Sequence, residues 1–273
     1  MRCFTGFCQF SQNISYKSLV NLECGNLNSC YNHSTELAQI QGALQKKLGF
    51  FVTKLLSCNY SSDSARYFIP FYARNILEIS ATALLARIDP FRAIITYKVQ
   101  NDASYSIEAP SNVAINWSKD ILADDPPPAK GLWHFENKIK DFNRALFSKY
   151  QGEIIWKPAF LELTDYISTH PQPSSWLQQL LADDETAFFE RYRSNARQLF
   201  SSFSKGVHAE SLTEVSLLYD EITLTTLSED LLRWCCILGL LSHFSPYILL
   251  PFSQRIALTQ FLQAERMVAN ALQ

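Results

Sequence analysis

Glycine is scarce in this sequence, at 8 of 273 residues, and the glycine-dependent motifs of nucleotide binding are missing. Neither GxGxxG nor GxxxxGKS/T occurs, and HExxH, GxSxG and CxxC are absent as well. So few glycines also argue against a turn-rich β-sandwich. The sequence therefore predicts none of the common nucleotide-binding, zinc-protease or serine-hydrolase centres.

The charge is nearly balanced, because the sequence contains 24 Lys and Arg residues and 26 Asp and Glu residues, for a net charge of −2. Nucleic-acid binding would then depend on a local basic patch rather than on a global excess. Aromatic residues are plentiful, with 19 Phe and 12 Tyr. They indicate a heavily packed interior or a large protein interface.

Seven cysteines are present, and their odd number and the adjacent Cys235–Cys236 pair do not indicate a disulfide framework. The first residues lack the basic stretch and apolar run of a secretory signal. We therefore expect reduced thiols and a cytoplasmic protein, with no metal or cofactor. The one candidate zinc set has spacings at or beyond the usual upper limit, and it comprises Cys3, Cys8, Cys24, Cys30 and His33.

Apolar residues recur at spacings of three and four, which predicts a mainly α protein, an irregular bundle of about seven to nine helices. Ser34 is the expected N-cap of the first long helix. Asp89 and Pro90 end a nearly all-apolar, and hence buried, helix and start the next. The helices are expected over 34–55, 71–88, 132–150, 158–168, 174–182, 185–207 and 253–272, with another that begins at Ser228.

Residues 91–117 and 153–157 are rich in β-branched and aromatic side chains, which permits one small β element. Three prolines in 118–131 predict a loop or linker. The predicted organisation is therefore an irregular leader, an N-terminal helical subdomain, this linker and a C-terminal helical subdomain, over 1–33, 34–117, 118–131 and 132–273.

The most apolar stretch, 231–252, is interrupted by Arg233 and His243 and broken by two prolines. No run of eighteen uncharged residues remains, so the sequence predicts a buried helix and no association with a membrane.

Arg74 and Glu78 lie four residues apart in the helix that we expect to be buried. Because an unpaired charge in an apolar environment is costly, the two are expected to form a buried polar pair. The alternative is that they belong to a ligand pocket or a subunit interface.

The helix over 185–207 places a polar strip beside its apolar arc. Arg197 and His208 are about 16 Å apart along its axis, too far to act on one bond within a single chain. The strip is then either a solvated face that ends in a histidine cap or a basic surface for nucleic acid. The candidate binding residues are Arg191, Arg193, Arg197, Lys205 and His208.

A long helix that ends in SKGVHAES, together with the buried segment RNILEISATALLARIDPFR, resembles the HEPN-type helical domains of prokaryotic toxin and anti-phage systems. The ribonucleases of that family carry an Arg, four to six residues and then a His on one helix. No histidine here follows an arginine at that spacing. The resemblance therefore implies a helical relative without the family's catalytic pair.

These patterns favour a non-catalytic accessory or scaffolding subunit of a multiprotein complex, in a prokaryotic defence system. One alternative is a HEPN-like, metal-independent ribonuclease that uses His208 with Arg193 or Arg197. A second alternative is a nucleic-acid-binding module that uses the basic helix face.

Overall fold

The computed structural model describes residues 16–30, 34–106, 108, 113–123, 131–134, 142–207 and 219–272. These residues form helices and turns and contain no strand, so the mainly α prediction is confirmed. The expected β element is wrong for the described residues. Its first range contains helix α5 (Pro90–Gln100), and its second range forms the π-helix η3 (Gly152–Trp156) and the start of the next helix.

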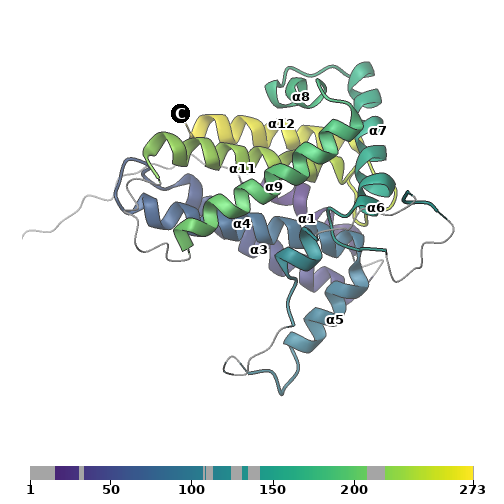
Figure 1. Ribbon diagram of the computed structural model, residues 1–273, viewed down its shortest axis with the longest axis horizontal. Coiled ribbons are helices and arrows are strands. Elements are labelled where there is room, and N and C mark those ends of the chain that lie inside the picture. Colours follow the sequence, from purple (N-terminus) through teal and green to yellow (C-terminus); the bar gives the residue numbers. More distant parts are fainter. Residues whose placement is uncertain are drawn as a thin grey trace, which may run out of the picture.

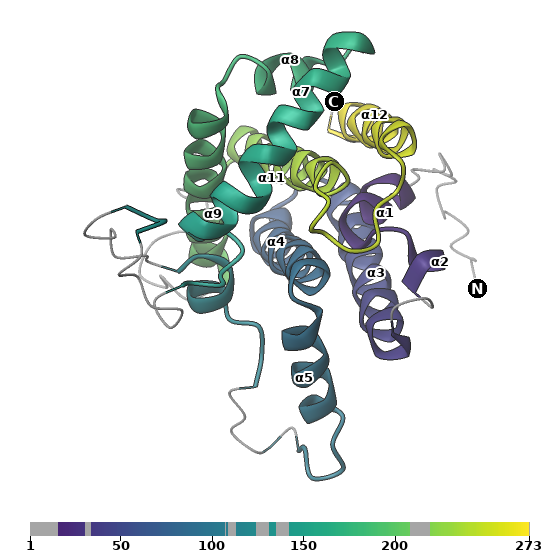
Figure 2. The same cartoon turned by 90° about the vertical axis from the view of Figure 1, so that its right-hand side faces the viewer.

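Helix α4 (Ala65–Ile88) lies in the middle of the bundle, buried on most of its surface as its composition predicts (Figures 1 and 2). Helix α4 packs against α1 (Lys17–Cys24), α3 (Thr35–Leu56), α9 (Glu185–Val207) and α11 (Glu221–Leu241). Helix α12 (Gln254–Ala271) packs against α1 and α11.

Helices α3 and α4 form an antiparallel hairpin. The Ser34 hydroxyl accepts a hydrogen bond from the Leu37 amide at 2.9 Å, which caps α3 as predicted. Further along, the Gln41 side-chain amide donates to the Ala83 carbonyl of α4 at 3.0 Å. Asp89 then ends α4 and caps α5, where its carboxylate accepts from the Arg92 amide.

The two predicted helical subdomains share one hydrophobic core. Leu48 and Ile76, from 34–117, belong to the same buried cluster as Trp156, Phe203 and Leu238, from 132–273. The proline-containing segment 118–131 therefore does not separate two cores. Its described start forms the π-helix η1 (Trp117–Ile121), which packs on α4.

The predicted irregular leader is wrong for the described part of 1–33. Residues Lys17–Cys24 form α1, whose Leu19 and Leu22 are fully buried, and α2 (Leu27–Cys30) follows. Helix α1 lies so close to α11 that a Cβ on Gly239 would come within 2.8 Å of the Leu22 Cβ atom. Eight residues are too few to give a clear helical period in the sequence, which explains the wrong prediction.

Two further boundaries differ from the prediction. The described parts of 132–150 are turns up to Ser148, which caps the short α6 (Lys149–Gln151), so no continuous helix spans this range. Helix α11 begins at Glu221 with Asp220 as its cap, seven residues before the expected start at Ser228. The remaining expected helices are present as α7 (Lys157–Thr169), α8 (Ser175–Leu180), α9 and α12.

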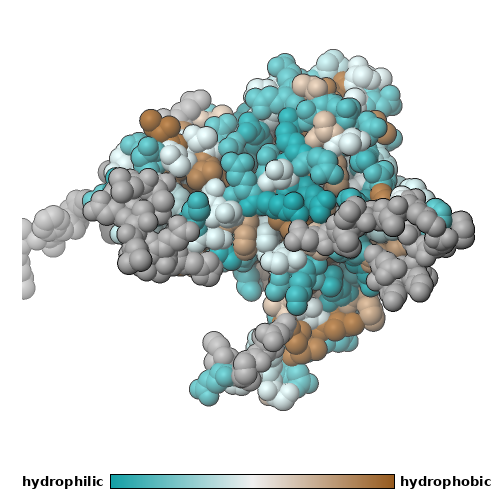
Figure 3. Space-filling model, in the orientation of Figure 1, coloured by the Kyte–Doolittle hydropathy of each residue, from teal (hydrophilic) through white to brown (hydrophobic). Residues whose placement is uncertain are grey.

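The surface in the view of Figure 3 is largely hydrophilic with scattered apolar residues, and an apolar patch lies near the bottom, where Figure 1 shows α5. Helix α5 extends away from the bundle beyond the end of α4 (Figure 2). Among the described residues, no helix has the length and apolar character needed to cross a bilayer.

Candidate functional site

A cavity of about 450 Å³ opens between α4, α9 and η1. Its size is within the range of small-molecule sites, which is about 300–1,000 Å³. Side chains of mixed character line it, among them Arg74, Glu78, Thr82, Trp117, Ile121 and Phe200. We refer to it as the Arg74 cavity.

The structure contains the expected contact between Arg74 and Glu78, with 3.1 Å between Nε and Oε1. The pair is not buried, however, because the two side chains are 17% and 43% exposed. Their face of α4 borders the cavity rather than the core, so water screens the pair and its contribution to stability is small. The pair lines the cavity, and the alternatives of a ligand pocket and a subunit interface both stay predictions.

Arg74 is held in place by α9 as well. Its Nη1 atom donates to the Ser204 hydroxyl at 2.8 Å, and its guanidinium lies 4.4 Å from the centre of the Phe200 ring. The Trp117 ring stacks on Phe200 at 4.6 Å, with 6° between the ring planes. These contacts fix the positions of one cation and two aromatic rings at the wall of the cavity.

The predicted basic face of α9 is not continuous. Arg193 is only 7% exposed, and its Nη2 atom donates to the Ala123 carbonyl at 3.1 Å, so it anchors the chain after η1 to α9. Arg191 forms an ion pair with Asp183 at 2.5 Å. Arg197 and Lys205 are exposed, and His208 lies outside the described residues. The structure therefore does not bring the four described candidates together in one exposed basic surface.

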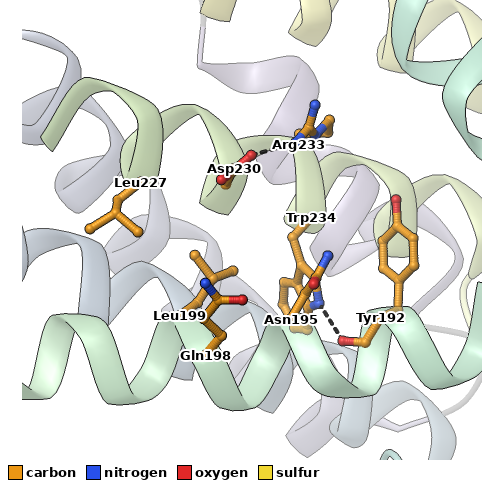
Figure 4. A pocket seen from close by; sticks show the side chains of 8 residues that line it. All are labelled: Tyr192, Asn195, Gln198, Leu199, Leu227, Asp230, Arg233 and Trp234. Atoms are coloured by element: carbon orange, nitrogen blue, oxygen red, sulfur yellow. Dashed lines mark hydrogen bonds and ion pairs between the residues drawn. The ribbon is translucent and has the colours of Figure 1, made fainter. Parts of the chain in front are cut away.

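A second groove, of about 240 Å³, lies between α9 and α11 (Figure 4). Asn195 and Gln198 come from α9, and an ion pair between Asp230 and Arg233 comes from α11. Tyr192 also lines the groove, and burial raises the pKa of its hydroxyl, which keeps the proton at neutral pH. The groove therefore offers hydrogen-bonding groups and one ion pair.

A third polar site is buried inside the bundle and centred on Arg87, whose side chain is completely inaccessible. Its guanidinium donates to the carbonyl oxygens of Leu22 and Glu23, both at 3.1 Å, and to that of Leu249 at 2.8 Å. It also donates to the Ser242 hydroxyl at 2.7 Å. Arg87 thus satisfies the last carbonyl groups of α1 and ties α1 to the end of α11.

His243 completes this buried site. Its Nδ1 atom accepts from the Phe252 amide at 3.0 Å, so Nε2 carries the proton and donates to the Leu22 carbonyl at 3.1 Å. Burial and the neighbouring Arg87 charge hold the pKa of the imidazole well below its usual value. The ring is neutral and acts as a structural bridge.

Glu23 is fully buried nearby, and neither of its carboxyl oxygens has a hydrogen-bond partner. Burial raises the pKa of this carboxyl well above its ordinary value, and the Arg87 charge offsets only part of the effect. Burial also raises the pKa values of the Cys235 and Cys236 thiols, which are therefore poor nucleophiles. The sequence analysis did not predict this site. The presence of Arg87 in an otherwise apolar segment could have indicated a buried polar centre.

No family model, curated protein or solved structure matches this chain. Membership of the HEPN family therefore stays a prediction. Among the described residues, no group of three or more His, Cys, Asp and Glu side chains could hold a metal ion. Cys3, Cys8 and His33 of the candidate zinc set lie outside these residues.

Proposed function

We propose that this protein is a scaffolding subunit that binds two protein partners, one at each end of the α3–α4 hairpin. The observation that carries this proposal is a pair of exposed apolar surfaces at the two ends of the hairpin. Single exposed apolar residues are common on protein surfaces, but contiguous groups of them are typical of interfaces.

The first surface, here called the aromatic end, is formed by α3 and the first turns of α4. The Phe50 and Phe68 rings are more than half exposed, and Phe71 between them is nearly half exposed. Phe51 and Tyr72 connect them into one cluster, with 6.1 Å between the Phe51 and Phe71 ring centres and 6.1 Å between those of Phe68 and Tyr72. Aromatic side chains are enriched among the residues that dominate protein interfaces.

The second surface, here called the α5 stripe, consists of the exposed side chains of Phe91, Ile95 and Val99. They recur every four residues, so they share one face of α5. Phe91 alone is 68% exposed. A helix that projects an apolar face of this kind matches the way in which helices dock into grooves of partner proteins.

The two surfaces are well separated. Ile40 of α3 packs with Ala86 and Ala93 near the α5 stripe, whereas Phe51 meets Phe71 at the other end. From Phe71 to the end of α4 the helix rises about 26 Å, so a single small interface would not cover both surfaces. Two distinct sites on one rigid hairpin favour a scaffold over a protein with one binding partner.

The test is affinity purification of the tagged protein from its native cells at native expression level, with quantitative mass spectrometry. Phe68→Ser with Phe71→Ser alters the aromatic end, and Phe91→Ser with Ile95→Ser alters the α5 stripe. Ile222→Ser on α11, where the side chain is 77% exposed, is the matched control. We expect each double variant to lose a different stoichiometric partner while the control retains both.

A wild-type protein that purifies alone, or partners that remain in both double variants, would contradict the proposal. The defence-system setting stays a prediction that this experiment addresses through the identity of the partners. Arg193 does not favour the ribonuclease alternative, because its side chain is buried and donates a hydrogen bond to a backbone carbonyl.

A further inference from the structure

We infer that the Arg74 cavity binds a neutral, planar heterocycle whose edge carries a hydrogen-bond acceptor beside an N–H donor, the chemistry of the nucleobases. This site is distinct from the two surfaces of the proposed scaffold, and the inference does not depend on them.

The hydrogen-bonding capacity that the cavity leaves open determines the class of ligand. Arg74 uses Nε and Nη1 within the protein, and its Nη2 atom makes no hydrogen bond to any described residue. Glu78 uses Oε1, and Oε2 likewise has no partner there. Because the two side chains are neighbours on one face of α4, they present a donor beside an acceptor. The complementary ligand edge is an acceptor beside a donor.

The charges at the cavity wall favour a neutral ligand. Arg74 and Glu78 compensate each other at 3.1 Å. Of the other ionic groups close by, Asp120 is paired with Arg92 at 2.7 Å. A polyanion would therefore meet one cation that is already neutralised by its neighbour, which is a weak basis for binding phosphate.

The remaining walls suit a flat ring. Trp117 is partly exposed and lines the cavity, while Phe200 supports its ring from α9. Ile79 and Ile121 add apolar surface. A heterocycle can stack on the indole while its polar edge meets the Arg74–Glu78 pair, and stacking of a base on an aromatic side chain contributes about 1–3 kcal/mol.

The polar groups are also held before a ligand arrives. Ser204 and Phe200 fix the Arg74 guanidinium from α9, and Glu78 fixes it from its own helix. Side chains that are already immobilised lose little conformational entropy on binding, so more of the interaction energy appears as affinity.

The test uses isothermal titration calorimetry of the whole protein with guanosine, inosine and 1-methylinosine as probes. Guanosine and inosine carry a carbonyl beside an N–H, and in 1-methylinosine a methyl group replaces the hydrogen of that N–H. We expect the first two to bind at least about tenfold more tightly than 1-methylinosine, because the methyl group leaves the Glu78 carboxylate without its donor. Guanosine monophosphate should bind no more than a few times better than guanosine; a much larger gain would overturn the inference of a neutral ligand.

Glu78→Gln replaces the free acceptor with an amide at nearly constant shape and should weaken guanosine binding about tenfold or more. Trp117→Leu should weaken it by a similar factor through loss of stacking. Asp230→Asn makes the matched change in the groove between α9 and α11 and should leave binding unchanged. Circular dichroism melts establish that each variant is folded. The inference fails if the wild type binds none of the three nucleosides at millimolar concentration, shows no preference among them, or retains its affinity in Glu78→Gln.

Discussion

Replacing Arg87 with methionine tests whether the buried polar site holds the bundle together. Methionine keeps much of the length and volume of the side chain but removes its donors. Three carbonyl oxygens and one hydroxyl then lose the guanidinium hydrogen bonds that they accept at 2.7 to 3.1 Å. The Leu22, Glu23 and Ser242 acceptors lie in the interior, where water cannot easily replace the lost donor, and the bond to the Leu249 carbonyl is partly buried.

The magnitude follows from two opposing effects. Each buried acceptor left without a donor costs about 1–3 kcal/mol, and at most three are affected, because the Leu22 carbonyl keeps its hydrogen bond from His243 Nε2. Against this, the variant no longer has to desolvate the charge of Arg87, and that penalty is itself several kcal/mol. Because a hydrogen bond to a charged group contributes about 1.5–3 kcal/mol on balance, we expect a net loss of about 3–5 kcal/mol. For a domain with a free energy of unfolding of about 5–15 kcal/mol, this is a substantial fraction.

The assay is equilibrium unfolding in urea, followed by far-ultraviolet circular dichroism, for the wild type and for Arg87→Met. Arg66→Met on the same helix is the control, because Arg66 forms an ion pair with the highly exposed Asp63, and its loss should change the free energy of unfolding by no more than about 0.5 kcal/mol. Arg87→Lys should recover part of the loss at most, since three donors on one nitrogen cannot reach all four acceptors. A loss below about 1 kcal/mol in Arg87→Met would refute the view that this centre joins α1 to α4 and α11.

Two further predictions concern the contacts of α1. Gly239→Ala should lower the free energy of unfolding by about 1–3 kcal/mol, because the new methyl group would lie 2.8 Å from the Leu22 Cβ atom. Gly42→Ala places its new methyl group with no atom within 4 Å, so it should instead stabilise α3 by up to about 1 kcal/mol. Urea titrations measure both changes in the free energy of unfolding. The same change in both variants would exclude the close approach of α1 to Gly239. The pKa of the Glu23 carboxyl is raised in the folded state, so its favourable contribution is complete below the ordinary value of 4.5 and is lost as the pH rises towards the folded pKa. Glu23→Gln should therefore become more stable relative to the wild type as the pH increases from 5 to 8, whereas parallel stability curves would show that Glu23 does not titrate in this way.

The long helices could be predicted from the sequence because their signals are local. Ser34 and Asp89 are caps whose hydrogen bonds depend only on the next three residues, and both positions were predicted correctly. The helix over 185–207 has enough turns for its apolar face to be unmistakable. Helix α1 has only eight residues, and it is stabilised by burial against α11 and α12 rather than by its own pattern.

The polar sites depended on contacts between distant segments, and the sequence could not supply these. Arg74 and Glu78 were recognised as neighbours, yet the cavity beside them requires Phe200 and Trp117, which are far away in the chain. Arg193 was assigned to an exposed strip because helical spacing alone placed it there. The chain after η1 covers that part of α9, and its Ala123 carbonyl converts the arginine into a buried anchor.

Helix α4 connects all of these features, and this connection bears on how a scaffold of this kind would work. Its first turns carry part of the aromatic end, its middle forms a wall of the Arg74 cavity, and its last turn holds Arg87 in the interior. The α5 stripe follows directly after Asp89. Because Arg87 fixes the end of α4 to α1 and α11, the orientation of α5 relative to the bundle depends on the buried site. Loss of that site should therefore disturb binding at the α5 stripe more than binding at the aromatic end, which α3 and α4 form through ring contacts of their own.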